Sequence, residues 1–326
     1  MLRFLQSIFG SADQGGYPES LVREALERAV DATDPQLRAV SGYRKKLRSA
    51  VLRAIDHVVA LVDALPPPTP VGLGVTEEAP AIRSFFISAI HMRKAIADDP
   101  GLAGFLQGPE GYSPRVVALL AVEKQEKVIL GAGLSGDIVI HDVPQVTVSF
   151  DGHRFLDPAA SEEETRQLLK RRAYDHLLSL ALRRLTVLKG VRSDLERRRA
   201  LLQAKLNLLK RGNWGFDLAE QGEKLDAPTV EERLARIEEQ LLELGGDDHV
   251  FEAYLEAVTD VLGQPAEYLR AESETIFVDR MGIKRSEAAA DAPELRLNEL
   301  YNAEGRSLVV TLVALSGEEL RGNVPA

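Results

Sequence analysis

Two leucine-rich segments of opposite charge, separated by a loop, constrain the fold of this chain most strongly. The first, residues 183–211, holds ten Lys and Arg residues and two acidic residues, and the second, residues 231–248, holds seven acidic residues and two Arg. One seam of a heptad repeat in the first contains Leu185, Leu188, Arg192, Leu195, Arg199, Leu202, Leu206 and Leu209. In the second, spacings of four and three alternate along Val230, Leu234, Ile237, Leu241 and Leu244. The pattern predicts an antiparallel, coiled-coil-like helical hairpin within residues 160–246, whose opposite charges favour pairing of its arms.

Strand-like segments flank the predicted hairpin on both sides. Residues 111–158 contain the short β-branched runs "RVVALLAVEK", "KVIL", "DIVIHDV", "QVTVSF" and "RFLD", which predict an antiparallel meander with one buried face. Residues 272–316 contain "TIFVDRMGIKR", "ELRLNEL" and "RSLVVTLVAL". Because a few short strands are only marginally stable alone, we expect both groups to form one split antiparallel sheet into which the hairpin is inserted.

Helical patterns fill most of the remaining chain. Residues 1–110 predict an N-terminal helical domain in which Ser20 caps one helix, residues 80–97 form another, and Asp34-Pro35 and Asp99-Pro100 each start a helix. Ser161 and Glu164 have the spacing of a capping box at the start of the hairpin, and residues 247–271 predict a packing helix. The predicted fold class is therefore α+β, helix-dominated, with a helical domain, a split antiparallel sheet and an inserted hairpin.

A glycine motif raises the possibility of a dinucleotide cofactor. Gly131, Gly133 and Gly136 have the spacing G-x-G-x-x-G, and Asp151 follows. The cofactor-binding form of this motif needs a helix after the glycines, but "DIVIHDVPQ" is short, rich in β-branched residues and contains Pro144. We therefore predict that residues 131–136 form a turn between antiparallel strands, that "VPQ" forms the next turn, and that no cofactor binds.

Several titratable residues lie in the same stretch, namely His141, Asp142, Asp151, His153 and Asp157. Imidazole and carboxylate groups on neighbouring strands are possible metal ligands, but His141 and Asp142 point to opposite faces of a strand. Solvated turn residues are the favoured interpretation, and whether His141, Asp151 and His153 form a ligand site is left open. No catalytic, cofactor-binding or metal-binding residue is predicted.

Bulk composition restricts the functional class and the location. The chain lacks cysteine, which excludes disulfides and thiolate metal sites, and its formal net charge of −10 disfavours general nucleic-acid binding. No apolar run has the ~18 residues of a membrane-spanning helix, and the N-terminus does not resemble a signal peptide. We expect a cytoplasmic protein, with peripheral membrane contact as an alternative.

Three groups of residues are the candidates for partner contacts. The N-terminal apolar stripe contributes Phe4, Ile8 and Phe9, the basic arm contributes Arg198 and Arg199, and the loop at the hairpin tip contributes Trp214 and Phe216. The leading hypothesis is a non-enzymatic scaffold or adaptor that assembles with itself or a protein partner through the hairpin and the helical domain. The alternatives are an enzyme or small-ligand binder with a site near residues 131–153, and a peripheral membrane factor that uses the N-terminal helix.

Overall fold

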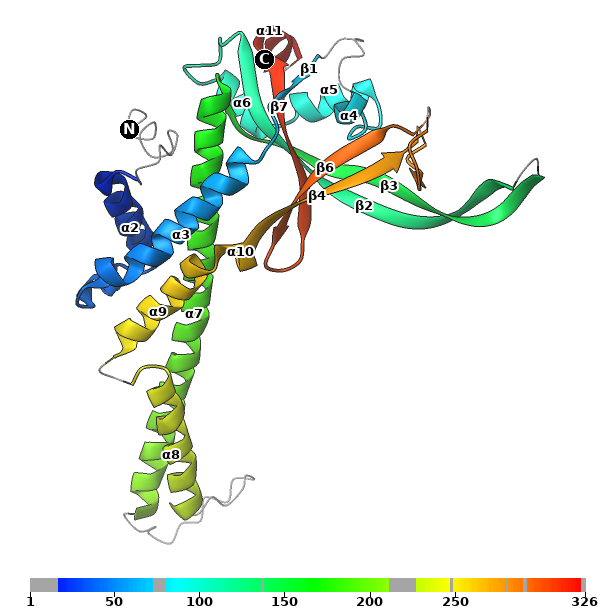
Figure 1. Cartoon of the computed structure of the whole chain (residues 1–326). Coiled ribbons are helices and arrows are strands. Elements are labelled where there is room, and N and C mark those ends of the chain that lie inside the picture. Colours follow the sequence, from blue (N-terminus) through cyan, green and yellow to red (C-terminus); the bar gives the residue numbers. More distant parts are fainter. Residues whose placement is uncertain are drawn as a thin grey trace. The chain divides into compact units, whose positions relative to one another are not determined.

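The computed structural model describes residues 17–72, 80–135, 138–210, 227–246, 249–279, 281–289 and 292–323. It confirms the predicted helix-dominated α+β fold with an inserted helical hairpin (Figure 1). The described helices are α2 (Glu19–Thr33), the 3₁₀ helix η1 (Pro35–Ala39), α3 (Tyr43–Asp63), α4 (Pro80–Arg83), α5 (Ala89–Ala97), α6 (Pro100–Leu106), α7 (Glu162–Lys210), α8 (Ala227–Glu243), α9 (Val250–Gly263), α10 (Pro265–Tyr268) and α11 (Gly317–Asn323). The described strands are β1 (Thr69–Val71), β2 (Arg115–Ser135), β3 (Ile138–Ala159), β4 (Leu269–Val278), β5 (Lys284–Arg285), β6 (Glu294–Asn302) and β7 (Ser307–Ser316).

The strands form one sheet, which unites the two groups of strands predicted on either side of the hairpin. The strand order is β3-β2-β7-β6-β4-β5, with antiparallel neighbours, and β1 pairs with β7 in the parallel sense. The contact between β2 and β7 unites the strands before the hairpin with those after it. An isolated bridge between Thr147 and Ile283 also connects β3 to the segment that precedes β5.

The predicted meander of short strands is wrong in its details. Residues 115–159 form one hairpin of two long strands, and Gly131 and Gly133 lie within β2, paired with Val143 and Ile140. The predicted "VPQ" turn lies inside β3, where Pro144 pairs with Leu130. A proline is tolerated at the edge of a sheet, because its missing N–H can face away from the ladder. No helix follows the glycines, since β3 begins at Ile138.

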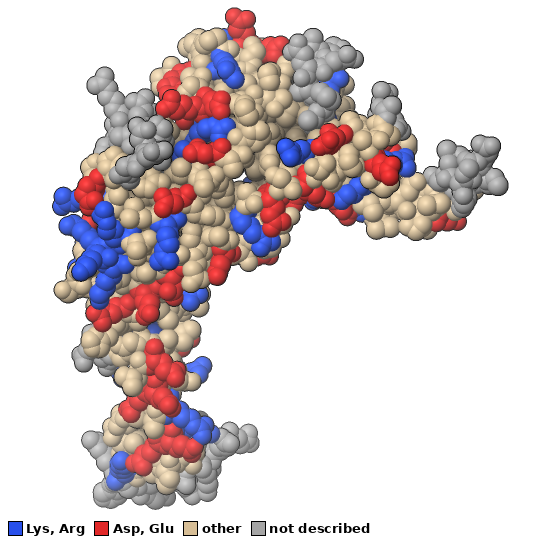
Figure 2. Space-filling model, viewed as in Figure 1, with Lys and Arg blue, Asp and Glu red and all other residues tan. Residues whose placement is uncertain are grey.

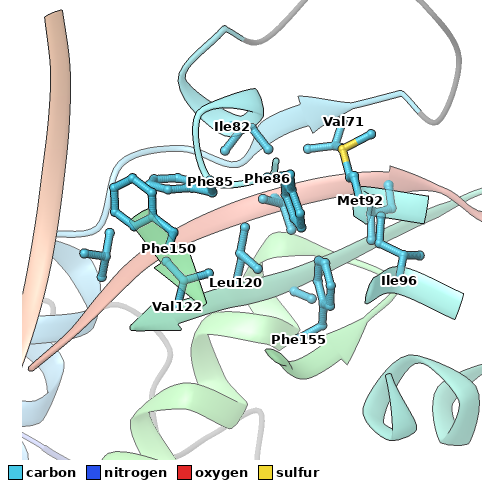
Figure 3. Packing of buried hydrophobic residues seen from close by; sticks show 14 of the residues in the cluster. Val71, Ile82, Phe85, Phe86, Met92, Ile96, Leu120, Val122, Phe150 and Phe155 are labelled. Atoms are coloured by element: carbon cyan, nitrogen blue, oxygen red, sulfur yellow. The ribbon is translucent and has the colours of Figure 1, made fainter. Parts of the chain in front are cut away.

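The sheet is buried on both faces, not on one as predicted. Alternate residues of β2 enter two different cores: Val116, Ala118, Leu120 and Val122 enter one, and Leu119 and Ala121 enter the other. The first core receives Ile82, Phe85, Met92 and Leu102 from the α4–α6 region (Figure 3). The second receives Val62 from α3 and Leu169 from α7. Coverage on both faces explains why "RVVALLAV" is a nearly continuous apolar run.

Several predicted helix boundaries are corrected or confirmed by capping contacts. Helix α2 begins at Glu19 after Pro18, so Ser20 is not its cap, and the predicted helix 80–97 is two helices, the second capped by Ser88. Asp34 and Asp99 do cap η1 and α6. The capping box of Ser161 and Glu164 is also present at the start of α7. The predicted helix 247–271 comprises α9, the short α10 and the first residues of β4.

The chain divides into two compact units. One contains the sheet and comprises the described residues within 55–174 and 265–323, and the other is helical and comprises the described residues within 17–54 and 175–264. Helices α3 and α7 therefore contribute residues to both units. Whether the four predicted segments, 1–110, 111–158 with 272–316, 160–246 and 247–271, fold independently stays a prediction.

Candidate interaction surfaces

Strands β2 and β3 continue past the sheet as a two-stranded ribbon. Strand β7 pairs with β2 only along residues 115–122, whereas β3 pairs with β2 as far as Ser135 (Figure 1). Residues 123–135 and 138–151 therefore depend mainly on each other for backbone pairing, and we call them the ribbon arm. An isolated two-stranded ribbon is marginally stable in water, so this arm needs anchoring contacts at its base.

A network of ions anchors the base of the ribbon arm. Lys124 of β2 forms ion pairs with Glu274 of β4 and Glu299 of β6. Lys284 of β5 contacts Glu126 of β2 at 3.0 Å and Glu274 at 3.1 Å. Burial of the Lys124 ammonium acts to lower its pKa, but hydrogen bonds to Glu274 and Glu299 outweigh this and raise it. Lys124 is consequently charged at any physiological pH and ties three strands together.

Backbone contacts add to this anchor. The Val148 N–H donates to the Gly282 carbonyl oxygen at 2.7 Å, beside the bridge between Thr147 and Ile283. The loop that presents Gly282 is itself held by Asp279, whose carboxylate accepts from the N–H groups of Met281 and Ile283, both at 2.9 Å. The ribbon arm is therefore fixed at about the level of Val148.

The apolar face of the sheet core continues onto the ribbon arm beyond this anchor. Because paired residues of antiparallel strands point to the same face, Phe150, Val148, Val146 and Pro144 share a face with Lys124, Glu126, Val128 and Leu130. Phe150 and Val148 are buried in the core, whereas Val128 is 72% exposed and Leu130 is 68% exposed. We call Val128, Leu130, Pro144 and Val146 the arm patch. It is core-like surface without a cover among the described residues.

Close packing also explains the first glycine of the motif. A Cβ atom on Gly131 would approach the Gln145 side-chain oxygen to 2.3 Å, so any larger residue would displace that side chain. Because this oxygen lies at the end of a flexible side chain, a larger residue at position 131 would need only a rearrangement of Gln145. The side chains of residues 132–140 lie outside the described part of the structure.

The helical hairpin forms the second projecting element. Leu195 of α7 packs with Ile237 and Leu241 of α8, and Lys210 contacts Glu231 across the arms at 2.8 Å. Of the remaining predicted seam residues, Leu185 and Leu206 are buried, but Leu209 is 42% exposed. Acidic and basic side chains lie next to each other over the hairpin in Figure 2, in keeping with the charge pattern of the two arms.

The structure places only some of the predicted interface residues. Arg198 is exposed on α7, and Arg199 is half-buried within the predicted seam. Trp214, Phe216, Phe4, Ile8 and Phe9 lie outside the described residues.

The candidate ligand residues of the β2–β3 region do not gather into one site. His141 is exposed, Asp151 accepts a hydrogen bond from the Gly152 N–H, and Asp157 holds Arg172 through two hydrogen bonds. His153 contacts the Phe85 carbonyl oxygen at 2.6 Å, and burial lowers its pKa. Within the described part of the chain, no three His, Asp or Glu residues are placed to share a metal ion.

A pocket that the sequence did not suggest lies at the other end of β3. It has a volume of about 290 Å³ and lies among α6, the end of β3 and the first turns of α7. Its walls are mostly apolar, with Phe105, Pro158 and Leu168, and its polar groups include Gln167 and Arg171. The pocket lies outside residues 131–153, for which the sequence suggests an alternative ligand site.

Comparison with known proteins adds no functional information. No family model, curated protein or solved structure matches this chain. Among the described residues, no helix has both the length and the apolar character needed to cross a membrane. The function is therefore inferred from the surfaces themselves.

Proposed function

We propose that the protein is a non-enzymatic scaffold or adaptor that assembles with itself or with a protein partner. The helical hairpin and the helical domain of residues 1–110 were the predicted contact elements, and we add the ribbon arm as a third. The observation that carries the proposal is the arm patch, in which the apolar face of the sheet core extends past the anchoring ions into solvent. Exposed apolar surface on a projecting strand pair is typical of an element that is covered in an assembly.

The anchor supports this function because it holds the base of the ribbon arm in place and leaves the distal part available for contact. The pairs of Lys124 and Lys284 with their carboxylates hold the base in one position, so the distal part is presented without being packed. A pre-positioned contact surface loses less conformational freedom on binding than a mobile one. The proposed assembly is cytoplasmic, and the N-terminal stripe with Phe4, Ile8 and Phe9 remains a candidate for additional protein or membrane contact.

The test is a paired substitution in the arm patch. Val128→Ser with Leu130→Ser removes apolar contact area from two exposed side chains, so the melting temperature should stay within a few degrees of the wild type. Sedimentation velocity or cross-linking should show a loss of the protein contacts made through the wild-type arm patch. The matched control is Ile87→Ser with Ile90→Ser, which changes side chains that are 88% and 78% exposed elsewhere. Assembly that persists unchanged in the arm variant contradicts the role of the ribbon.

A small-ligand binder is the second candidate, and the pocket beside α6 favours it. A cavity of about 290 Å³ with mainly apolar walls fits a small apolar ligand with one polar end. Leu168→Trp should fill this cavity and abolish any thermal shift produced by such ligands, without changing assembly. An intact thermal shift in that variant would place ligand binding elsewhere.

A further inference from the structure

Helix α7 carries a second heptad seam in addition to the one that packs on α8. Spacings of three and four alternate through Arg184, Val187, Val191, Asp194, Arg198, Leu201, Lys205 and Leu208, which we call the outer seam. Each of these residues directly precedes a residue of the seam that faces α8, so the outer seam lies about 100° around the helix from it. A partner on the outer seam therefore does not compete with α8.

No described residue covers the outer seam, although it contains valine and leucine side chains of the kind that pack between helices. Val187 is 63% exposed, Val191 47%, Leu201 66% and Leu208 70%. Arg184, Asp194, Arg198 and Lys205 are exposed as well. The seam extends about 36 Å along the helix at 1.5 Å per residue, a length sufficient for a stable helix pair.

Two copies of the outer seam are complementary to each other when they run in opposite directions. When two copies run antiparallel about a two-fold axis near residue 196, Val191 lies opposite Leu201 of the second copy and Asp194 lies opposite Arg198. The same alignment places Val187 against the aliphatic stem of Lys205, and Arg184 against Leu208. Every apolar residue thus meets an apolar group, and the one acid meets a base. An isologous pairing of this kind creates each contact twice.

The parallel alternative is electrostatically unfavourable. Side-by-side parallel helices would place Asp194 against Asp194, Arg198 against Arg198 and Lys205 against Lys205. Like charges at such positions act against a pairing geometry. In the antiparallel pair, Arg197 approaches its own copy near the axis, but at the solvent-exposed margin, where screening by salt is strong. Gly190 and Ala204, on the same margin, are small and permit close approach of the helices.

We infer that a second copy of this chain binds the outer seam and forms an antiparallel α7–α7 dimer. The inference rests on the self-association branch of the proposed function and specifies its surface, partner and geometry. It also assigns a role to Arg198, one of the predicted interface residues, because Arg198 lies in this seam. The arm patch is a separate surface and remains available for further contacts.

Charge reversal tests the geometry in the full-length protein. Arg198→Asp places two aspartates opposite each other at both ends of the axis, so the dimer dissociation constant should rise about tenfold or more. Asp194→Arg should weaken the dimer similarly, whereas the double variant Asp194→Arg with Arg198→Asp restores both opposite-charge pairs and should return to within about threefold of the wild type. Lys45→Asp is the control, because it makes the same change of charge at an exposed site outside the seam. Analytical ultracentrifugation measures the dissociation constants of the wild type and of all four variants.

Cysteine cross-linking tests the same geometry directly, because the chain has no native cysteine. A Val191→Cys protein mixed with a Leu201→Cys protein should form the mixed disulfide dimer upon mild oxidation, with little of either homodimer. Mass spectrometry separates the three products when one protein is labelled with ¹⁵N. A Val191→Cys homodimer as the main product would indicate parallel helices and overturn the inference.

The remaining outcomes distinguish this inference from the broader function. A wild-type oligomer that is insensitive to Arg198→Asp and gives no mixed disulfide shows that assembly occurs through another surface, which refutes the outer seam and leaves the scaffold function standing. A wild-type chain that is monomeric at 100-micromolar-scale concentration, about the weak end of specific association, refutes both the seam and self-association. The cross-linking experiment with the arm-patch variant would then test assembly with a partner protein.

Discussion

At the scale of single residues, Glu27 of α2 is the centre of the ion pairs that join α2, η1 and α3 within the helical unit. Its carboxylate accepts hydrogen bonds from Arg38 at 2.9 Å, from the Tyr43 hydroxyl at 2.8 Å and from Arg44 at 2.8 Å. The hydrogen bond from Arg38, followed by that from Tyr43, lowers the pKa of Glu27 from 4.5 to about 2. A carboxylate that is easier to ionise in the folded state than in the unfolded state stabilises the fold when it is charged.

The sign of this effect predicts a pH dependence. Stabilisation by Glu27 is fully present above pH 4.5, its unfolded value, and is lost as the pH falls toward about 2. Glu27→Gln should therefore lower the melting temperature at pH 7, and the difference from the wild type should shrink steadily between pH 5 and pH 2. Glu238→Gln, at an exposed position of α8, serves as the control and should differ little from the wild type at any pH. A difference that is constant with pH would mean that Glu27 acts through packing and not through charge.

At the scale of elements, the inner seam of the hairpin holds α7 and α8 together by apolar burial. Ile237 is 9% exposed and packs with Leu195 and Leu241. Leu242, on the same helix, is 73% exposed. The ion pair of Lys210 with Glu231 lies at the surface, with both side chains more than half exposed. Exposed ion pairs contribute about 0–1 kcal/mol, so leucine and isoleucine burial dominates the pairing.

Truncation of Ile237 should therefore weaken the hairpin far more than truncation of its exposed neighbour. We expect Ile237→Ala to cost roughly 2–4 kcal/mol of hairpin stability through lost burial and a cavity, and Leu242→Ala to cost less than about 0.5 kcal/mol. Hydrogen exchange of the α8 amides is the appropriate measurement, because it reports the opening of this element separately from the sheet. Equal effects of the two substitutions would show that the described packing of α8 is incorrect.

At the scale of the whole molecule, the apolar packing between the hairpin arms is distinct from the cores on the two faces of the sheet. Of the described residues within 190–244, none belongs to the two cores on either side of the sheet, and the packing of the hairpin arms comes from Leu195, Ile237 and Leu241. The arms run antiparallel, so the two ends of the hairpin lie near each other and a short linker can bridge them. The hairpin is thus separable in principle from the sheet.

Replacement of residues 190–244 by a short Gly/Ser linker should leave the sheet unit folded and remove self-association. The expected readouts are a retained cooperative thermal transition and a monomer by light scattering. Unfolding of the entire chain would show that the hairpin belongs to the central core. A folded variant that keeps its assembly state and every identified partner would refute the role of the hairpin in the scaffold.

The sequence alone determined the elements that depend on local or periodic chemistry. The heptads of residues 183–211 and 230–244 predicted the hairpin, because the spacing of apolar residues along a helix fixes which face is buried. Asp34 and Asp99 predicted helix starts, because capping involves backbone groups only two or three residues away. The split sheet was also predictable, since strand-like segments on both sides of the hairpin need partners to be stable.

Tertiary structure alone decided the rest, because it depends on contacts between residues far apart in the chain. Pro144 suggests a turn locally, but pairing with Leu130 and anchoring of the base by Lys124 and Glu274 keep β3 continuous. Whether an apolar residue is core or exposed surface likewise depends on where the covering elements end. Val148 and Val128 lie on the same face of the ribbon arm. Val148 is buried in the sheet core, at the level where the backbone of the arm bonds to the segment before β5, whereas Val128 lies beyond that anchor and is a candidate for partner contact.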